Sequence, residues 1–263
     1  VTSTALIKLD SSGALDIGRL NMVEFAYGLT GHNEIIGNVL NPLSPKHITG
    51  GSSSGPAAAV SGNLSYGSLG SDTGGSIRFP ASCCGIVGMK PTYGMVSRYG
   101  LAAFASSLDQ IGPFAQTVED AALLLEVISG HDPMDSTSYP TEVPRYSSEI
   151  QSPISPCKLG LPAEFFGPGM DDEVRKSIED AIKFYESKGF EIVQVSLPCT
   201  DLSIPVYYVI ATAEASSNLA RYDGIRYTSR SLKAENAIDV YSKSRGEGFG
   251  EEVKRRCILG AYA

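Results

Sequence analysis

The sequence reads Gly70-Ser71-Asp72-Thr73-Gly74-Gly75-Ser76-Ile77-Arg78-Phe79-Pro80 shortly after a first serine-glycine cluster, Gly50-Gly51-Ser52-Ser53-Ser54-Gly55. In the second cluster, paired glycines run directly into a serine. Glycine readily adopts the positive-φ conformations that other residues resist, so several successive N–H groups can converge on one point beside the Ser76 hydroxyl. An oxyanion hole is built in this way next to a nucleophile.

A glycine-serine cluster is more often a flexible loop than a catalytic centre. Here, however, two such clusters flank Ala57-Ala58-Ala59-Val60, a run that suits the start of a buried helix. Small residues let backbone segments pack closely. The arrangement therefore favours a built site over a linker.

Both clusters, in this order and at this spacing, resemble the hallmark of the amidase signature family: Gly-Gly-Ser-Ser, then Gly-Ser/Thr-Asp-x-Gly-Gly-Ser-Ile-Arg. Other segments resemble one branch of that family, the glutaminase subunits of glutamyl-tRNA(Gln) amidotransferases. These segments are residues 84–94, 96–101, 104–113, 213–221 and 247–256. The resemblance thus covers nearly the whole chain.

This resemblance implies a Ser-Ser-Lys mechanism. Ser76 attacks the carboxamide carbon, and Ser52, whose peptide bond is cis in the family, relays a proton between Ser76 and a lysine. A serine hydroxyl is a weak nucleophile that needs such a base within hydrogen-bond reach. The implied oxyanion donors are the N–H groups of Thr73, Gly74, Gly75 and Ser76.

The resemblance also implies a substrate site for glutamine. Tyr207, Tyr208 and Arg256 stand where the branch contacts its substrate, and an arginine offers a fork for the α-carboxylate. Core packing of the two tyrosines is an equally open alternative.

Three further residues are expected to support the site, namely Ser53, Asp72 and Arg78. Asp72 and Arg78 flank the nucleophile and could orient its loop by hydrogen bonds. For this pair we favour a structural salt bridge over direct participation in catalysis.

The family's lysine lies upstream, in a Gly-apolar-Pro segment that ends in Lys-Asp, and nothing before Ser52 matches it. The early lysines, Lys8 and Lys46, lack the expected neighbours. We therefore expect residues 1–263 to be a single amidase-signature domain that is truncated at both ends and inactive by itself.

Composition bounds the remaining classes of function. The net charge of −8 argues against a stand-alone nucleic-acid binder, because phosphate contacts require clustered Lys and Arg. The five cysteines show neither zinc nor disulfide spacing, so we expect a reduced intracellular setting and no metal site. That setting is the cytoplasm of a bacterium or the matrix of a mitochondrion or chloroplast. No apolar run is long enough for a membrane span.

Two segments predict regular structure. Thr117-Val118-Glu119-Asp120 resembles a capping box before a helix over 121–128, with Gly130 as its stop signal. An amphipathic helix over 171–188 lies between expected strands over 158–161 and 190–195, and this order predicts a parallel βαβ unit. Residues 131–156 are rich in Pro, Ser, Thr and Asp and predict a surface loop within one domain.

We therefore predict an α/β enzyme of the amidase-signature fold, with a mixed central sheet flanked by helices on both faces. The predicted function is hydrolysis of glutamine to release ammonia, which amidates Glu-tRNA(Gln) on a partner subunit. We expect a B-like partner and a small C-like subunit, with tRNA held mainly by the partner. This chain needs no cofactor, whereas ATP and Mg are expected in the partner. Two alternatives are a free-standing amidase for small carboxamides and a non-catalytic assembly subunit.

Overall fold

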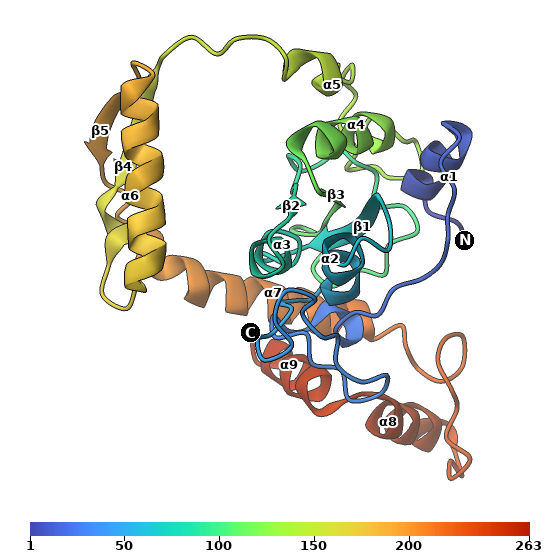
Figure 1. Ribbon diagram of the computed structural model, residues 1–263. Helices are drawn as coiled ribbons and strands as arrows, with labels where there is room; N and C mark the ends of the chain where they lie inside the picture. The colour runs from blue at the N-terminus through green and yellow to red at the C-terminus, as the bar shows by residue number, and fades with distance from the viewer. The chain divides into compact units, whose positions relative to one another are not determined.

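The structure is a computed structural model that describes residues 1–263. It divides into two compact units (Figure 1). The first comprises Val1–Gln151 together with Val209–Ala263, and the second comprises Ser152–Tyr208. The expected surface connection over 131–156 contains the boundary between them, and the single domain expected over 1–263 stays a prediction.

The first unit holds three strands and most of the helices. The strands are β1 (Gly67–Asp72), β2 (Val87–Gly88) and β3 (Gln110–Ala115). The helices before β3 are α1 (Thr4–Ser11), the short 3₁₀ helix η1 (Glu24–Ala26), α2 (Ser54–Ser61) and α3 (Arg78–Cys83). Those after β3 are α4 (Val118–Ile128), α5 (Tyr146–Glu149), α8 (Ala237–Gly248) and α9 (Glu251–Ala261). Helix α7 (Ser203–Leu219) begins in the second unit and ends in the first.

Strand β3 is the centre of an antiparallel sheet with the order β1-β3-β2. All six of its residues are buried, which is typical of a strand covered on both faces. Successive side chains of a strand point to opposite faces. Accordingly Phe114 packs in a cluster with residues of α2 and α3, whereas Ile111 packs in another with residues of α1 and α4. The sheet is therefore the middle of three layers.

The predicted helix after β3 is confirmed as α4. Thr117 is its N-cap, and the Thr117 hydroxyl accepts a hydrogen bond from the N–H of Asp120 at 3.1 Å. Gly130 follows the helix with φ +114°, a conformation that favours glycine and suits a helix end. The helix begins at Val118, three residues before the expected start, and ends at Ile128 as expected.

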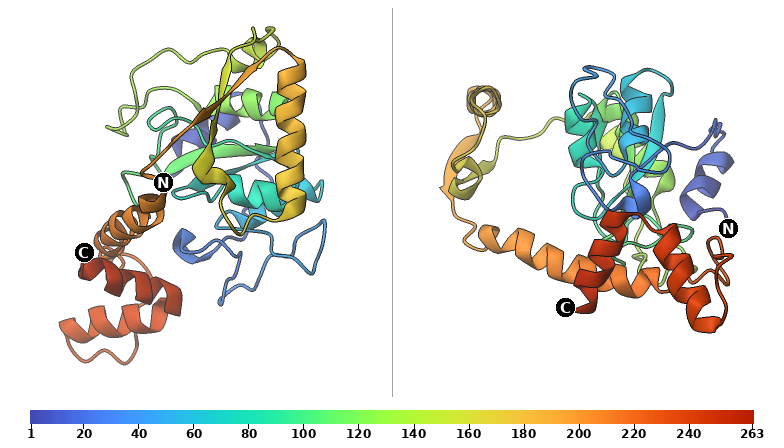
Figure 2. Two further views of the ribbon diagram at one scale, coloured as in Figure 1. Left: turned by 90° about the vertical axis from the view of Figure 1, so that its left-hand side faces the viewer. Right: turned by 90° about the horizontal axis from the view of Figure 1, so that it is seen from below.

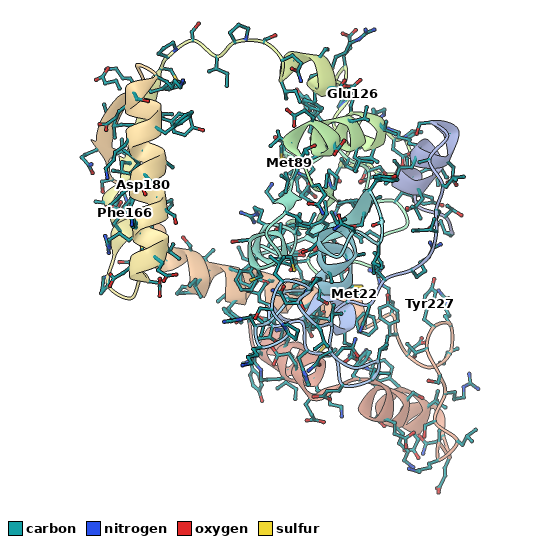
Figure 3. The ribbon with its side chains drawn as sticks, in the orientation of Figure 1. Met22, Met89, Glu126, Phe166, Asp180 and Tyr227 are labelled. Atoms are coloured by element: carbon teal, nitrogen blue, oxygen red, sulfur yellow. The ribbon has the colours of Figure 1, made fainter.

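The second unit is the predicted βαβ unit. Strands β4 (Lys158–Pro162) and β5 (Glu191–Val195) pair in parallel, and α6 (Asp172–Ser187) connects them and runs alongside (Figure 2). The short helices η2 (Ala163–Phe166) and η3 (Thr200–Leu202) complete the unit. Figure 3 labels Asp180 on α6 and Phe166 on η2.

The α/β fold class is confirmed, and helices cover both faces of the β1-β3-β2 sheet. Antiparallel and parallel pairing both occur, but in separate sheets within these 263 residues. None of the helices is both long and apolar enough to cross a membrane.

Truncation of the central strand tests this layer order. Replacing the fully buried Phe114 by alanine is expected to lower the free energy of unfolding by about 3–5 kcal/mol, since a buried ring is lost and a cavity remains. The control is Tyr66→Ala, at a side chain that is 99% exposed, with an expected change within about 0.5 kcal/mol. Urea unfolding of the full-length protein measures both, and equal effects would contradict the assignment of β3 to the core.

Candidate active site

The first serine cluster forms a buried loop that leads into α2. The peptide bond between Gly51 and Ser52 is cis, as the resemblance predicted. The Ser52 carbonyl accepts a hydrogen bond from the N–H of Val23 at 3.0 Å. The Ser52 hydroxyl is buried and makes no hydrogen bond within the chain. A buried polar atom without a partner is uncommon and points to a function or to a missing contact.

Ser53 joins the two serine clusters. Its hydroxyl donates to the Ser71 carbonyl at 3.1 Å and accepts from the Ser71 N–H at 3.2 Å, which fastens the first cluster to β1. Its own N–H donates to the Ser76 carbonyl at 3.3 Å. A side chain at Gly70 would place its Cβ 2.6 Å from the Ser53 hydroxyl oxygen, so this approach requires glycine. The supporting role predicted for Ser53 thus has a concrete geometry.

Ser76 lies in the turn between β1 and α3 and is buried. Gly75 precedes it with φ +113°, in the conformation that the glycine pair predicted. The Phe79 N–H donates to the Gly75 carbonyl at 2.8 Å and so starts the helical turn that follows. The hydroxyl of Ser76 is therefore presented from a short, well-defined turn.

Asp72 organises this turn from inside the protein. Its carboxylate accepts N–H groups from Gly75 at 2.7 Å, Ile77 at 3.1 Å and Arg78 at 3.3 Å. The guanidinium of Arg78 adds two further bonds, at 3.1 Å from Nε and 3.0 Å from Nη2. The salt bridge expected for this pair is confirmed.

The charge of Asp72 is stabilised despite its burial. Burial by itself raises the pKa of a carboxyl, but the hydrogen bonds from Arg78, Gly75 and Ile77 outweigh it and hold the pKa of Asp72 below its ordinary value. The turn that carries Ser76 is therefore built around an ionised carboxylate.

The predicted oxyanion donors differ in their availability. The N–H of Gly75 donates to Asp72, so this group already has an acceptor. The N–H groups of Thr73, Gly74 and Ser76 donate to no group of the chain. We therefore retain those three as candidate donors, whereas the donor role of Gly75 requires its bond to Asp72 to be shared.

Three lysines of the chain are bonded to groups other than the two serines, or are exposed. Lys8 donates to the Ser129 carbonyl at 2.5 Å at the end of α4, and burial lowers its pKa. Lys90 donates to the Pro91 carbonyl at 2.6 Å, and Lys46 is exposed. None of the three donates a hydrogen bond to Ser52 or Ser76.

The predicted substrate contacts fall in both compact units. Arg256, on α9 in the first unit, is buried and donates from Nε to the Glu252 carboxylate at 2.7 Å. Its guanidinium also lies over the rings of Tyr27 and Phe104. Tyr207 and Tyr208 stand at the start of α7 in the second unit, with their own rings in edge contact. Their role in substrate binding stays a prediction.

A cavity of about 320 Å³ lies beside Arg256. Its lining includes Arg256, Tyr27, Glu24, Glu34 and Glu252. The hydroxyl of Tyr27 is buried without a hydrogen-bond partner, and burial raises the pKa of this phenol. Nothing in the sequence singles out Tyr27, because one aromatic residue in a loop carries no signal of its position in space.

A second residue that sequence reasoning missed is Asp109. Its carboxylate accepts a hydrogen bond from the Thr73 hydroxyl at 2.6 Å. Asp109 stands within a segment that carried the resemblance, but nothing local identifies its partner 36 positions earlier.

The Asp72–Arg78 pair leads to a prediction about pH. Arg78→Gln removes the partner of a fully buried carboxylate, but the arginine side chain is 55% exposed, so we expect a loss of about 2 kcal/mol in unfolding free energy at pH 7. Because the pKa of folded Asp72 is depressed, its stabilisation is complete above the unfolded pKa, near 4, and is lost as the pH falls through the folded pKa. The deficit of the variant should therefore shrink in acid.

Urea titrations at pH 7 and at successively lower pH measure this deficit. The control is Arg19→Gln, at an exposed pair with Asp16, where the expected change is close to zero. A deficit that stays constant through acid pH would contradict the electrostatic origin.

Comparison with known proteins identifies the family of this chain. The Amidase family matches residues 2–263. The glutamyl-tRNA(Gln) amidotransferase A-subunit of Koribacter versatilis is 56% identical over 99% of this chain and 54% of its own length. The protein of the same name from Carboxydothermus hydrogenoformans is 57% identical, again over 99% and 54%.

A solved structure shares the fold. The glutamyl-tRNA(Gln) amidotransferase A-subunit of Thermotoga maritima superposes with a TM-score of 0.81 at 42% identity, covering 100% of this chain and 52% of that one. The chain thus spans about half the length of the relatives that it matches. From the family match and from these identities, the chain belongs to the amidase family.

Proposed function

We propose that this chain is part of a glutaminase subunit that releases ammonia for the amidation of Glu-tRNA(Gln). The observation that carries the proposal is the junction of the two serine clusters, where the N–H of Ser53 bonds the carbonyl of Ser76. This junction sets the unpartnered Ser52 hydroxyl in the loop next to the Ser76 turn. The names of the relatives support a role in a glutamyl-tRNA(Gln) amidotransferase.

The reaction begins at Ser76. Its hydroxyl oxygen attacks the side-chain carboxamide carbon of glutamine, and its proton passes through the Ser52 hydroxyl to a neutral lysine. The carbonyl oxygen becomes an oxyanion that the N–H groups of Thr73, Gly74 and Ser76 are free to bind. Donors of this kind lower the barrier by roughly 3 kcal/mol each.

The tetrahedral intermediate then collapses. The C–N bond breaks, the leaving nitrogen takes the proton back through Ser52, and ammonia departs from an acyl ester on Ser76. Water attacks the ester, and glutamate leaves with the serine hydroxyl restored. The reaction therefore needs no metal or cofactor from this chain.

The lysine is proposed to come from a segment outside these 263 residues. The Ser52 hydroxyl supports this proposal, because it is buried and has no hydrogen-bond partner among the described residues. The two lysines that precede it in the sequence, Lys8 and Lys46, make other contacts or are exposed. A lysine can act as a base when burial or neighbouring positive charge depresses its pKa.

Glutamine recognition is assigned to the cavity beside Arg256. A guanidinium can bind a carboxylate in two parallel hydrogen bonds, which fixes its orientation as well as its charge. The Arg256 guanidinium is positioned by its hydrogen bond to Glu252 and by its cation–π contacts with the rings of Tyr27 and Phe104. For Tyr207 and Tyr208 we keep the role in substrate binding that the family resemblance implies.

The assembly belongs to the same proposal. A B-like partner binds most of the tRNA and carries ATP and Mg, and a small C-like subunit completes the complex. The net charge of −8 supports this division, because an acidic chain is a poor surface for phosphate. We place the assembly inside the cell, in keeping with cysteines that lack disulfide spacing.

Substitution of the nucleophile gives the principal test. Ser76→Ala in the full-length enzyme, with its partner subunits, should lower ammonia release from glutamine by about 10³-fold or more, because the residues of such a unit act together. The matched control is Ser61→Ala, at the last residue of α2, which removes a hydroxyl that donates to the Cys84 carbonyl and should leave turnover unchanged. Retention of most activity by Ser76→Ala would mean that another residue is the nucleophile.

The same assay separates the alternatives. A free-standing amidase would hydrolyse small carboxamides without a partner, whereas a non-catalytic subunit would release no ammonia under any condition.

Arg256→Lys tests the carboxylate fork. We expect KM for glutamine to rise about 10- to 100-fold, because a compact ammonium cannot form the paired bonds of a guanidinium. The rate with a carboxamide that lacks a carboxylate should be unchanged. Arg255→Lys is the control, since Arg255 pairs with the same Glu252 from a half-exposed position. An unchanged KM in Arg256→Lys would contradict the assignment.

A further inference from the structure

Asp109 and Thr73 meet just beyond the end of the β1–β3 ladder. The last pair of that ladder is Asp72 with Gln110, so Thr73 and Asp109 form the next pair outward. Asp109 is only 2% exposed, and its Oδ1 accepts the Thr73 hydroxyl at 2.6 Å. The buried carboxylate of Asp109 is thus hydrogen-bonded to Thr73, the first residue of the segment that carries the candidate oxyanion donors.

The carboxylate of Asp109 is fixed by its own turn. Its Oδ2 accepts the N–H of Phe104 at 2.9 Å, and Oδ1 also accepts the N–H of Ala105 at 3.1 Å. Both oxygens are therefore occupied, and Thr73 supplies the only side chain that hydrogen-bonds to them. These hydrogen bonds hold the Asp109 carboxylate in one orientation.

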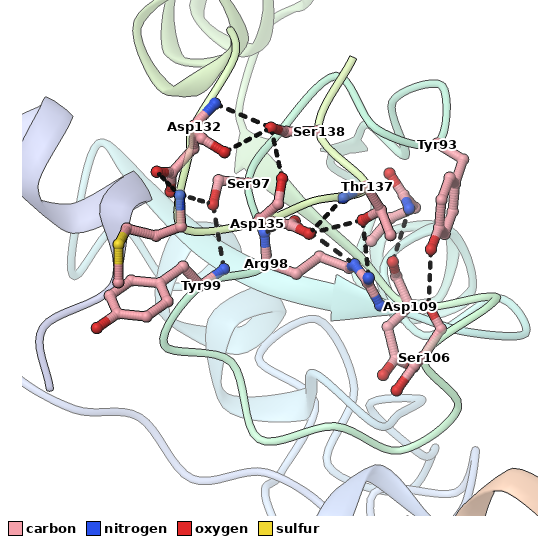
Figure 4. Close-up of polar contacts among 12 residues, drawn as sticks. Tyr93, Ser97, Arg98, Tyr99, Ser106, Asp109, Asp132, Asp135, Thr137 and Ser138 are labelled. Carbon is pink, nitrogen blue, oxygen red and sulfur yellow. Dashed lines mark hydrogen bonds and ion pairs between the residues drawn. The ribbon is translucent and has the colours of Figure 1, made fainter.

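The turn itself is tied to neighbouring elements. Asn218 on α7 donates to the Phe104 carbonyl at 3.2 Å, and Glu214 on the same helix accepts the N–H of Ser107 at 3.0 Å. Arg98 donates to the Ser106 carbonyl and bonds Thr137 at 2.8 Å (Figure 4). Thr73 is consequently held by a turn that is itself hydrogen-bonded to α7 and to Arg98.

Two buried carboxylates hold the donor segment at its two ends. Asp72 binds the N–H groups of Gly75, Ile77 and Arg78, at the end that carries Ser76. Asp109 holds Thr73 at the opposite end, and Gly74 between them has no side chain to fix it. The bond to Asp109 is the side-chain hydrogen bond that holds Thr73 where it leaves the end of β1.

We propose that Asp109 is a positioning residue that acts through the Thr73 hydroxyl to aim the N–H groups of Thr73 and Gly74 at the oxyanion. The inference rests on the proposed function for the reaction that it serves. Oxyanion stabilisation depends on donors that are already in place, and a misplacement of about 1 Å can cost about 10²-fold in rate. The bond should therefore affect kcat more than KM.

The test compares Thr73→Val with Thr73→Ser in the full-length enzyme with its partner subunits. Valine matches the shape of threonine without its hydroxyl, so we expect kcat for glutamine to fall about 10- to 100-fold while KM stays within about twofold. Thr73→Ser keeps the hydroxyl and should restore kcat to within about threefold of the wild type. The melting temperature of each variant is recorded beside the rates.

Ser97→Ala is the matched control. It deletes a hydroxyl that also donates to a buried aspartate at 2.6 Å, Asp132, whose network reaches the turn of Asp109 only indirectly, through Ser138, Asp135 and Arg98 (Figure 4). Its kcat should equal that of the wild type. Asp109→Asn combined with Thr73→Val should be no slower than the slower single variant, since both interrupt one bond.

Two outcomes would overturn the inference: a wild-type kcat in Thr73→Val, or an equal loss of kcat in Thr73→Ser and Thr73→Val. Failure of the proposed function looks different. A wild type that hydrolyses another carboxamide but not glutamine would refute the glutaminase assignment, and the same comparison of kcat, made on that carboxamide, would still decide the role of Asp109.

Discussion

The ionised carboxylate of Asp72 is the constraint on which the site depends. Three backbone N–H groups and one guanidinium converge on it, and together they define the turn from β1 into α3. Placing a charge in the interior is unfavourable unless it is fully hydrogen-bonded, and here five bonds surround it. The turn conformation and the charge therefore stabilise one another, and Ser76 takes its place from both.

The sheet explains how two serine clusters far apart in the sequence come together. Ser53 exchanges two hydrogen bonds with Ser71 of β1, while Ser76 lies a few residues beyond the end of that strand. Because β1 pairs with the buried strand β3, the loop of Ser52 is attached to the buried sheet of the first unit. The close approach is possible only because residue 70 has no side chain.

The features of this arrangement that depend on neighbouring residues or on the family resemblance could be predicted from the sequence. The cap of α4 at Thr117 and the βαβ order of the second unit depend on residues close together in the chain, and the cis bond at Ser52 followed from the family resemblance. The bond from Thr73 to Asp109 could not be predicted, because it requires the register of β1 on β3. The engagement of Gly75 by Asp72 was also missed, since a glycine pair indicates backbone freedom but not which acceptor each N–H will find.

The burial of β3 has a consequence for the motions of the molecule. The strand pairs with β1 along its length and with β2 at its last two residues, and helices cover both faces, so we expect most of its amide protons to exchange with solvent only when the first unit opens. Asp109 directly precedes this strand, and Thr73 directly follows the strand paired to it. The loops of the candidate site are thus attached to the element whose amides we expect to exchange most slowly.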